Sequence, residues 1–281
     1  MLQENSNRAM KNKLLMLLFA ALFALPVAAI KIKAKPAYKA GETLECVFYF
    51  NWKFVWVKAG GANLIIRETI YNGQKAQYMS LLSSTNEKAD AFFKMRDTLT
   101  TIYLPGKEVR PLYYRKASEQ GRRSYLNEVF YNYLPTGKVA VSQRYARTER
   151  TPVHRTDTCD AGVFDMMSML AYARNFDFST IKPGQRISYP IATGRRVEEQ
   201  RLIYRGKEKV KANDGLSYNC LKISLVELDD KGKEKTIVNF FVTDDENHLP
   251  ILLDLALNFG TAKARLSKKS GLMYPLIPTR R

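Results

Sequence analysis

The densest group of potential metal ligands in this sequence is the acidic run 244–246, which is closely followed by His248. Carboxylates and an imidazole can together bind a divalent cation. The run, however, lies between two apolar segments, 237–242 and 249–253, and short polar residues in such a place usually form a tight turn. We therefore interpret it as a hairpin tip, and the sequence predicts no metal and no cofactor.

Nucleophilic catalysis requires a base beside a thiol or a hydroxyl group. The nearest such pair is His154 with Cys159, in a polar stretch that does not force the two side chains together. The Gly-x-Ser-x-Gly motif of a nucleophile elbow is missing from the sequence. We interpret Cys159 as structural, and we predict no catalytic residue.

Three cysteines are present: Cys46, Cys159 and Cys220. Cys46 lies in an alternating apolar run and is predicted to be a core residue. In an oxidising compartment an odd number of cysteines leaves at least one thiol free. Cys159 and Cys220 are our candidate disulfide pair, although spacing alone does not fix the connectivity.

A hydrolase that acts on envelope glycans or lipids is the enzymatic alternative. Its mark would be two carboxylates that face each other across a cleft. The candidates are Asp97, Glu128, Asp165 and Asp245. Members of such a pair come from different strands, so the sequence leaves this alternative open.

Aromatic and basic residues favour ligand binding. Aromatic side chains that could line one concave face are Trp52, Phe54, Trp56, Tyr113, Tyr125 and Tyr131. Aromatic stripes on strands more often belong to the core, and that alternative stays open. The most basic stretch, 182–211, has nine basic and three acidic residues. Our candidate ligand-binding residues are Trp52, Trp56, Tyr113, Arg195 and Arg196.

The first 29 residues have the order of a secretory signal peptide. Lys11 and Lys13 precede the apolar run 14–25, and small residues follow at 27–29. The apolar run is short for a permanent membrane anchor. We expect export to the periplasm and a mature chain that begins near Ile30 without a transmembrane anchor. An uncleaved anchor is the alternative.

The whole chain carries a formal net charge of +18, and removal of the leader lowers it to +16. This charge attracts anionic partners. Outside the cytoplasm we exclude nucleic acid and expect anionic lipid, lipopolysaccharide, envelope glycan or another envelope protein. The charge is dispersed along the chain, which is also typical of an ordinary solvated surface.

Apolar alternation between turn residues predicts many strands. Asn72-Gly73 is the strongest hairpin signal, Gly60-Gly61 indicates a bulge, and the polar stretch 147–158 is predicted to be a loop. Residues 160–175 have helical spacing. Asp160 or Thr158 is the predicted cap of this helix, and Asp165 and Arg174 complement its dipole.

The predicted fold is mainly β, with curved antiparallel sheets, either an open barrel or two β lobes, joined through one α-helix. The lobes would span 30–158 and 176–281, with the connecting helix at 159–175. One continuous domain is the alternative.

A set of short motifs resembles a known family. The motifs, in chain order, are Gly41-Glu42-Thr43-Leu44, Trp56-Val57-Lys58-Ala59-Gly60, Arg96-Asp97, Arg110-Pro111-Leu112-Tyr113-Tyr114, Phe164-Asp165-Met166-Met167-Ser168, Tyr172-Ala173-Arg174, Lys182-Pro183-Gly184, Tyr204-Arg205-Gly206-Lys207-Glu208, and Thr243-Asp244-Asp245-Glu246-Asn247 leading to Pro250. This set resembles the exported bacterial family catalogued as domain of unknown function 3108. The resemblance implies a β-rich envelope protein of Gram-negative bacteria and carries no activity. We expect non-enzymatic binding of an amphipathic or anionic envelope component.

Overall fold

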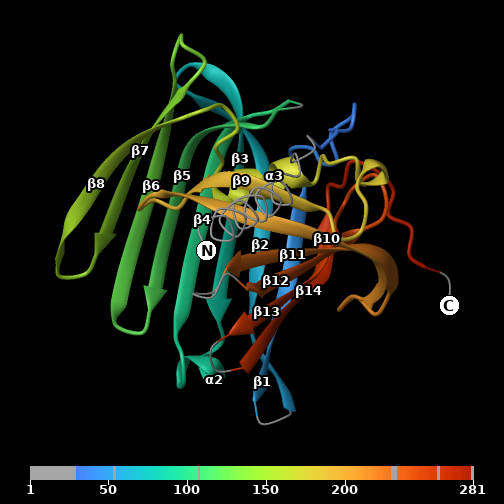
Figure 1. Cartoon of the computed structure of the whole chain (residues 1–281). Coiled ribbons are helices and arrows are strands. Elements are labelled where there is room, and N and C mark those ends of the chain that lie inside the picture. The colour runs from blue at the N-terminus through green and yellow to red at the C-terminus, as the bar shows by residue number, and fades with distance from the viewer. Residues whose placement is uncertain (1–29, 53–54, 107, 229–232, 258–259, 280–281) are drawn as a thin grey trace, which may run out of the picture.

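The computed structural model describes residues 30–279 except 53–54, 107, 229–232 and 258–259 (Figure 1). The predicted leader, residues 1–29, lies outside the described residues. The strands are β1 (Thr43–Trp52), β2 (Val55–Tyr71), β3 (Gln74–Thr85), β4 (Met95–Leu104), β5 (Arg110–Gln120), β6 (Arg123–Tyr133), β7 (Val139–Arg147), β8 (Arg150–Cys159), β9 (Arg186–Ala192), β10 (Val197–Lys211), β11 (Ser217–Leu228), β12 (Glu234–Thr243), β13 (Pro250–Leu257) and β14 (Gly260–Ser270). The helices are α2 (Glu87–Asp90), α3 (Met166–Ala173) and the short 3-10 helix Phe178–Thr180.

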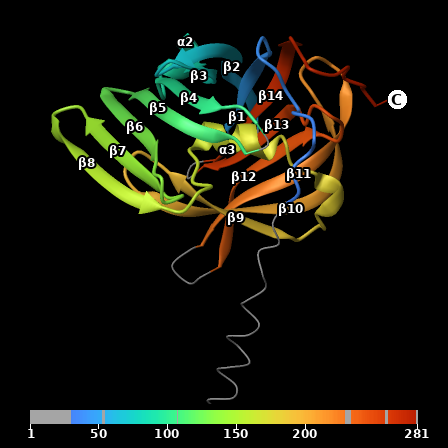
Figure 2. The same cartoon turned by 90° about the horizontal axis from the view of Figure 1, so that it is seen from above.

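All these strands form one antiparallel sheet of 14 strands, in the order β8 to β1 followed by β14 to β9. The pairing of β1 with β14, from Thr43 opposite Ser270 onward, joins the two halves of the chain. The mainly β prediction is therefore confirmed, and the architecture is the open-barrel alternative. The sheet curls around α3, which lies inside the curve (Figure 2).

Local sequence explains the two predicted irregularities. Asn72 and Gly73 have φ values of 49° and 78°, as a type I′ turn between β2 and β3 requires. At Gly60 the pairing of β1 with β2 shifts register, and the backbone passes so close to β3 that a Cβ atom would lie 2.0 Å from the Ser84 carbonyl oxygen. The predicted hairpin and the predicted bulge are both confirmed.

The loop predicted for 147–158 is wrong, because most of it forms the edge strand β8. Most side chains on both faces of β8 are exposed, so its sequence does not need the apolar alternation by which a strand is recognised. Charged residues and Pro152 are typical of an edge strand that must not pair with another molecule. The opposite edge strand, β9, also contains a proline, Pro190.

The central helix is shorter than the predicted span of 160–175, and its N-cap is Asp165, so both predicted caps, Asp160 and Thr158, are wrong. The chain before Asp165 stays extended because the backbone of Phe164 pairs with β9. The Phe164 amide donates to the Pro190 carbonyl at 3.0 Å, and the Ala192 amide donates to the Phe164 carbonyl at 2.7 Å.

The turn between β9 and β10 closes the curved sheet against β6 and β7. Asn127 donates to the Thr193 carbonyl at 2.7 Å, and the Gly194 amide donates to the Gln143 side chain at 3.0 Å. Inside the closed curve, aromatic rings pack around α3. These rings belong to Phe164, Tyr172, Phe176, Phe178 and Tyr189. The concave side of the sheet is therefore filled by the core.

Candidate functional site

The predicted aromatic residues do not share one concave face. Tyr113 is paired with Phe130, and the two rings lie 5.1 Å apart. Tyr131, the next residue, must point to the opposite side of β6, where it is buried. Tyr113 also donates to Glu128 at 2.8 Å on its own side. The expected single aromatic face is therefore wrong for these two tyrosines.

The two tryptophans both belong to the β1–β2 hairpin. Trp56 is 40% exposed, and the Lys263 ammonium lies 4.6 Å from the centroid of its ring. The side chain of Trp52 and the whole of Phe54 lie outside what the structure describes. Ligand binding by Trp56 stays a prediction.

Arg195 and Arg196 lie in the turn that closes the sheet. The Arg195 guanidinium stacks 3.8 Å from the centre of the Tyr145 ring, which is a packing contact across the closure. Arg196 forms an exposed ion pair with Glu198. Their role in ligand binding stays a prediction.

The acidic run forms the turn between β12 and β13. Asp245 accepts hydrogen bonds from Thr243 at 2.6 Å and from the Asn247 amide at 2.9 Å. His248 is buried, and its Nδ1–H donates to the Arg174 carbonyl at 2.6 Å. Burial lowers the pKa of His248 to about 4. Among the described residues no group of three or more His, Cys, Asp or Glu side chains is arranged to hold a metal.

The three thiols are free in the structure. Cys159 ends the edge strand β8, whereas Cys220 lies in β11, far from β8 in the sheet order. The candidate Cys159–Cys220 disulfide is therefore absent. Burial raises the pKa of Cys46 to about 11 and that of Cys220 to about 12.

The four candidate carboxylates each have local partners. Asp97 accepts a hydrogen bond from Ser118, Glu128 pairs with Arg144 at 2.7 Å, and Asp245 belongs to its turn. Asp165 caps α3 and accepts hydrogen bonds of 2.8–3.0 Å from the amides of residues 167 and 168 and from the hydroxyls of residues 101 and 168. Burial raises the pKa of Asp165 to about 6.

Arg174 has a role that the sequence did not reveal. Its guanidinium forms a two-point ion pair with Glu42, at 2.5 and 3.0 Å, and donates to the Asn247 carbonyl at 3.0 Å. The side chains of Arg174 and Glu42 are 2% and 0% exposed. Arg174 is the C-cap of α3, and its side chain forms a buried tether between the end of this helix and the residue that precedes β1. The predicted dipole interaction stays a prediction.

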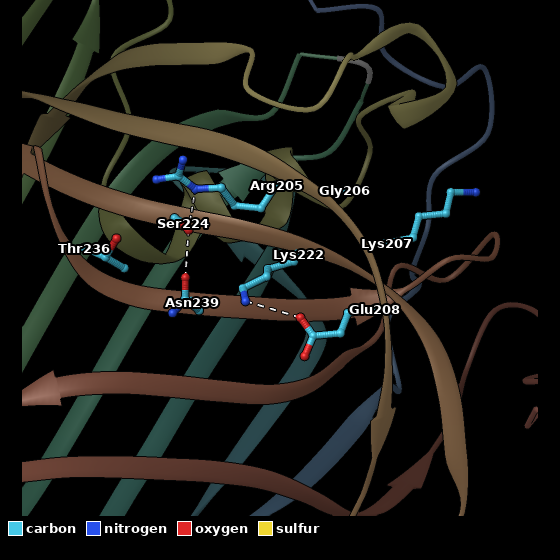
Figure 3. A pocket seen from close by; sticks show the side chains of 8 residues that line it. All are labelled: Arg205, Gly206, Lys207, Glu208, Lys222, Ser224, Thr236 and Asn239. Atoms are coloured by element: carbon cyan, nitrogen blue, oxygen red, sulfur yellow. Dashed lines mark hydrogen bonds and ion pairs between the residues drawn. The ribbon is translucent and has the colours of Figure 1, made fainter.

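A polar cavity of about 330 Å³ lies over β10, β11 and β12 (Figure 3). Its lining residues are Arg205, Gly206, Lys207, Glu208, Lys222, Ser224, Thr236 and Asn239. Ile223 belongs to the core, so its neighbours Lys222 and Ser224 point to the outer face of the sheet. We call this cavity the Arg205 pocket.

Hydrogen bonds fix the floor of the Arg205 pocket. The Arg205 Nε donates to Ser224 at 3.1 Å, and Ser224 donates to Asn239 at 2.7 Å. Lys222 pairs with Glu208 at 3.2 Å, and Lys207 pairs with Asp244 outside the pocket at 2.6 Å. Within the described part of the chain Arg205 has no ion-pair partner, and its Nε donates to Ser224.

A second cavity, of about 440 Å³, lies over β4 to β7. Its lining residues are Arg96, Thr98, Arg115, Ala117, Ser118, Glu119, Ser124, Tyr125, Leu126, Ala146, Arg147 and Thr148. Arg96 is already paired with Asp90 at 2.5 Å. The cavity is basic like the first, and hydrogen bonds between its lining residues join the Thr148 hydroxyl to the backbone of Ser124 at 2.8 and 3.2 Å.

A family model described as "Protein of unknown function (DUF3108)" matches residues 47–267. The chain belongs to the DUF3108 family. The resemblance predicted from the short motifs is thus confirmed, and the matched segment includes β2 to β13 together with the Arg205 pocket. No curated protein matches this DUF3108 chain.

Two solved structures are similar to this DUF3108 protein. One is a beta-barrel-like protein of domain of unknown function DUF1849 from Brucella abortus, with a TM-score of 0.52, 9% identity, and coverage of 85% of this chain and 99% of that one. The other is a "putative exported protein with YmcC-like fold" from Bacteroides fragilis NCTC 9343, with a TM-score of 0.32, 10% identity, and coverage of 86% and 100%. The first likeness shows the fold alone. None of the described helices of the chain has the length and apolar content that crossing a bilayer requires.

Proposed function

We propose that this protein is an exported, periplasmic binding protein that holds an anionic group of an envelope component in the Arg205 pocket. The observation that carries the proposal is a cation without an ion-pair partner among the described residues, at the edge of a cavity with hydroxyl and amide groups. A phosphate or carboxylate would form charge-assisted hydrogen bonds with the Arg205 guanidinium. Ser224, which bonds Arg205 Nε, keeps that guanidinium in place.

The periplasmic location rests on the leader sequence, residues 1–29. Cell fractionation followed by N-terminal sequencing tests it. A mature amino end near Ile30 on periplasmic material supports the proposal. An intact leader on cytosolic material would remove its basis.

Calorimetric titration with sn-glycerol 3-phosphate at low ionic strength tests the pocket. We expect measurable binding that weakens with added salt, because exposed charge attraction is screened. Arg205→Gln should lower the affinity by roughly tenfold or more, the effect of losing a charged hydrogen bond. The matched control is Arg201→Gln, on the same strand, which removes a cation that pairs with Glu234 outside the pocket. No binding by the wild type, or equal binding by the two variants, would refute the pocket.

A further inference from the structure

The end of the sheet that carries the β1–β2 hairpin exposes three consecutive apolar residues. Val55, Trp56 and Val57 are 62%, 40% and 46% exposed. Successive side chains on a strand point to opposite faces, so both faces of this hairpin are exposed. The hairpin therefore projects from the body of the sheet, and Figure 1 shows it at the same end of the molecule as α2.

The segment after α2 adds two exposed aromatic rings at this end. Phe92 is 81% exposed and Phe93 is 45% exposed. Asn86, the N-cap of α2, holds the segment beside the hairpin, because its side chain donates to the Lys58 carbonyl at 3.0 Å and its amide donates to the Ala59 carbonyl at 2.9 Å. We call Val55, Trp56, Val57, Phe92 and Phe93 the apolar rim.

Exposed cations surround the apolar rim. They are Lys58, Lys88, Lys94, Arg122 and Arg123. Arg122 lies in the β5–β6 turn and Arg123 begins β6. This turn adjoins Lys94, because the Gly121 amide donates to the Lys94 carbonyl at 3.0 Å. The exposed acids of these same segments are Glu87 and Glu119, while Asp90 is neutralised by Arg96. Positive charge is therefore in excess around the rim.

From this arrangement we infer that the apolar rim docks on the surface of an anionic lipid bilayer. Tryptophan and phenylalanine rings favour the boundary between headgroups and acyl chains, and lysine stems can lie along apolar surface while their charges reach anionic headgroups. Protein interfaces are instead depleted in lysine, so the lysines around the rim favour a lipid surface over a protein partner. The inference does not depend on the Arg205 pocket, which lies on β10 to β12.

Intrinsic fluorescence reports directly on this rim, because the only two tryptophans of the chain, Trp52 and Trp56, lie in its hairpin. In a Trp52→Phe protein, Trp56 is the single reporter. Vesicles of phosphatidylglycerol and phosphatidylcholine should shift its emission to the blue at low ionic strength. Lipids brominated near the headgroup should quench it, and vesicles of phosphatidylcholine alone should leave it nearly unchanged.

The double variant Phe92→Ser/Phe93→Ser should lower the vesicle partition coefficient at least tenfold with an unchanged far-ultraviolet circular dichroism spectrum. The matched control is Ile70→Ser, which removes a side chain that is 73% exposed near the other end of β2 and should leave partitioning unchanged. The inference would be overturned if the double variant partitioned as strongly as the Ile70→Ser control. It would also be overturned if anionic vesicles left the Trp56 emission of the Trp52→Phe protein unshifted. If the wild type formed a dimer and the double variant were a monomer, the apolar rim would instead be the contact surface for a second copy of the chain. Arg205→Gln should leave vesicle binding intact, which separates this test from that of the pocket.

Discussion

Removal of the Arg174 guanidinium should destabilise the fold strongly. Arg174→Met keeps much of the side-chain volume but leaves the Glu42 carboxylate, which is 0% exposed, without its cation. It also removes the donors that reach the Asn247 carbonyl. Breaking a buried ion pair from one side costs about 3–5 kcal/mol, because the remaining charge is buried without compensation. We therefore expect a loss of about 4 kcal/mol in the free energy of unfolding.

Urea denaturation followed by circular dichroism measures this loss, provided that the transition is two-state. The matched control is Arg196→Met, because Arg196 is 66% exposed in its pair with Glu198. An exposed pair contributes less than about 1 kcal/mol. Adding Glu42→Gln to Arg174→Met should recover part of the loss, since no unpaired charge then remains in the core. A loss for Arg174→Met no larger than that of the control would refute this reasoning.

Three further predictions concern single groups. The pKa of His248 is lowered to about 4 in the folded protein against 6.5 when unfolded, so its contribution to stability is present above pH 6.5 and is lost as the pH falls toward 4. Urea titrations between pH 6.5 and 4 should show that the free energy of unfolding of the wild type falls by about 3 kcal/mol, and His248→Asn should remove this fall. The same dependence of the unfolding free energy on pH in the variant and the wild type would contradict the prediction. In protein prepared without reductant, Ellman's reagent should find three thiols after denaturation, with Cys159 reacting before the fully buried Cys220 in the native state. A single thiol would reveal a disulfide, because one bridge uses two of the three cysteines. Gly60→Ala should cost more than about 2 kcal/mol in thermal or urea unfolding, because the added Cβ would lie 2.0 Å from a carbonyl oxygen, whereas Gly121→Asn, with φ +60° and open space, should cost little.

The strands could largely be predicted because most of them have one buried and one exposed face. This alternation is a local property of the sequence. The turn at Asn72-Gly73 and the bulge at Gly60 were predicted from a second local property, the presence of residue types that accept unusual backbone angles. Strand β8 was missed because an edge strand with exposed faces has no apolar alternation. The start of α3 was misplaced because the pairing of Phe164 with β9 holds the chain extended, and that pairing is tertiary.

The functional residues were less predictable than the strands, because residues far apart in sequence come into contact only when the sheet has formed. Arg174 and Glu42 are 132 residues apart in sequence, and no local signal links them. Arg205 likewise bonds Ser224 across two strands, whereas its own neighbourhood showed only a high density of positive charge. The registers in the first half of the sheet decided that Tyr113 and Tyr131 face opposite ways.

The tethering of α3 bears on where a ligand can bind. A ligand inside the curved sheet would have to displace the helix, which is held at Asp165 by its cap and at Arg174 by Glu42. A helix of eight residues is not stable alone in water, so its displacement would also unfold it. The loss of the Arg174 partner of Glu42 would by itself cost about 3–5 kcal/mol. Exposure of the aromatic rings around the helix would add to this cost. Binding on the outer face or at the apolar rim requires neither step, and both proposals therefore place the ligand on the outside of the sheet.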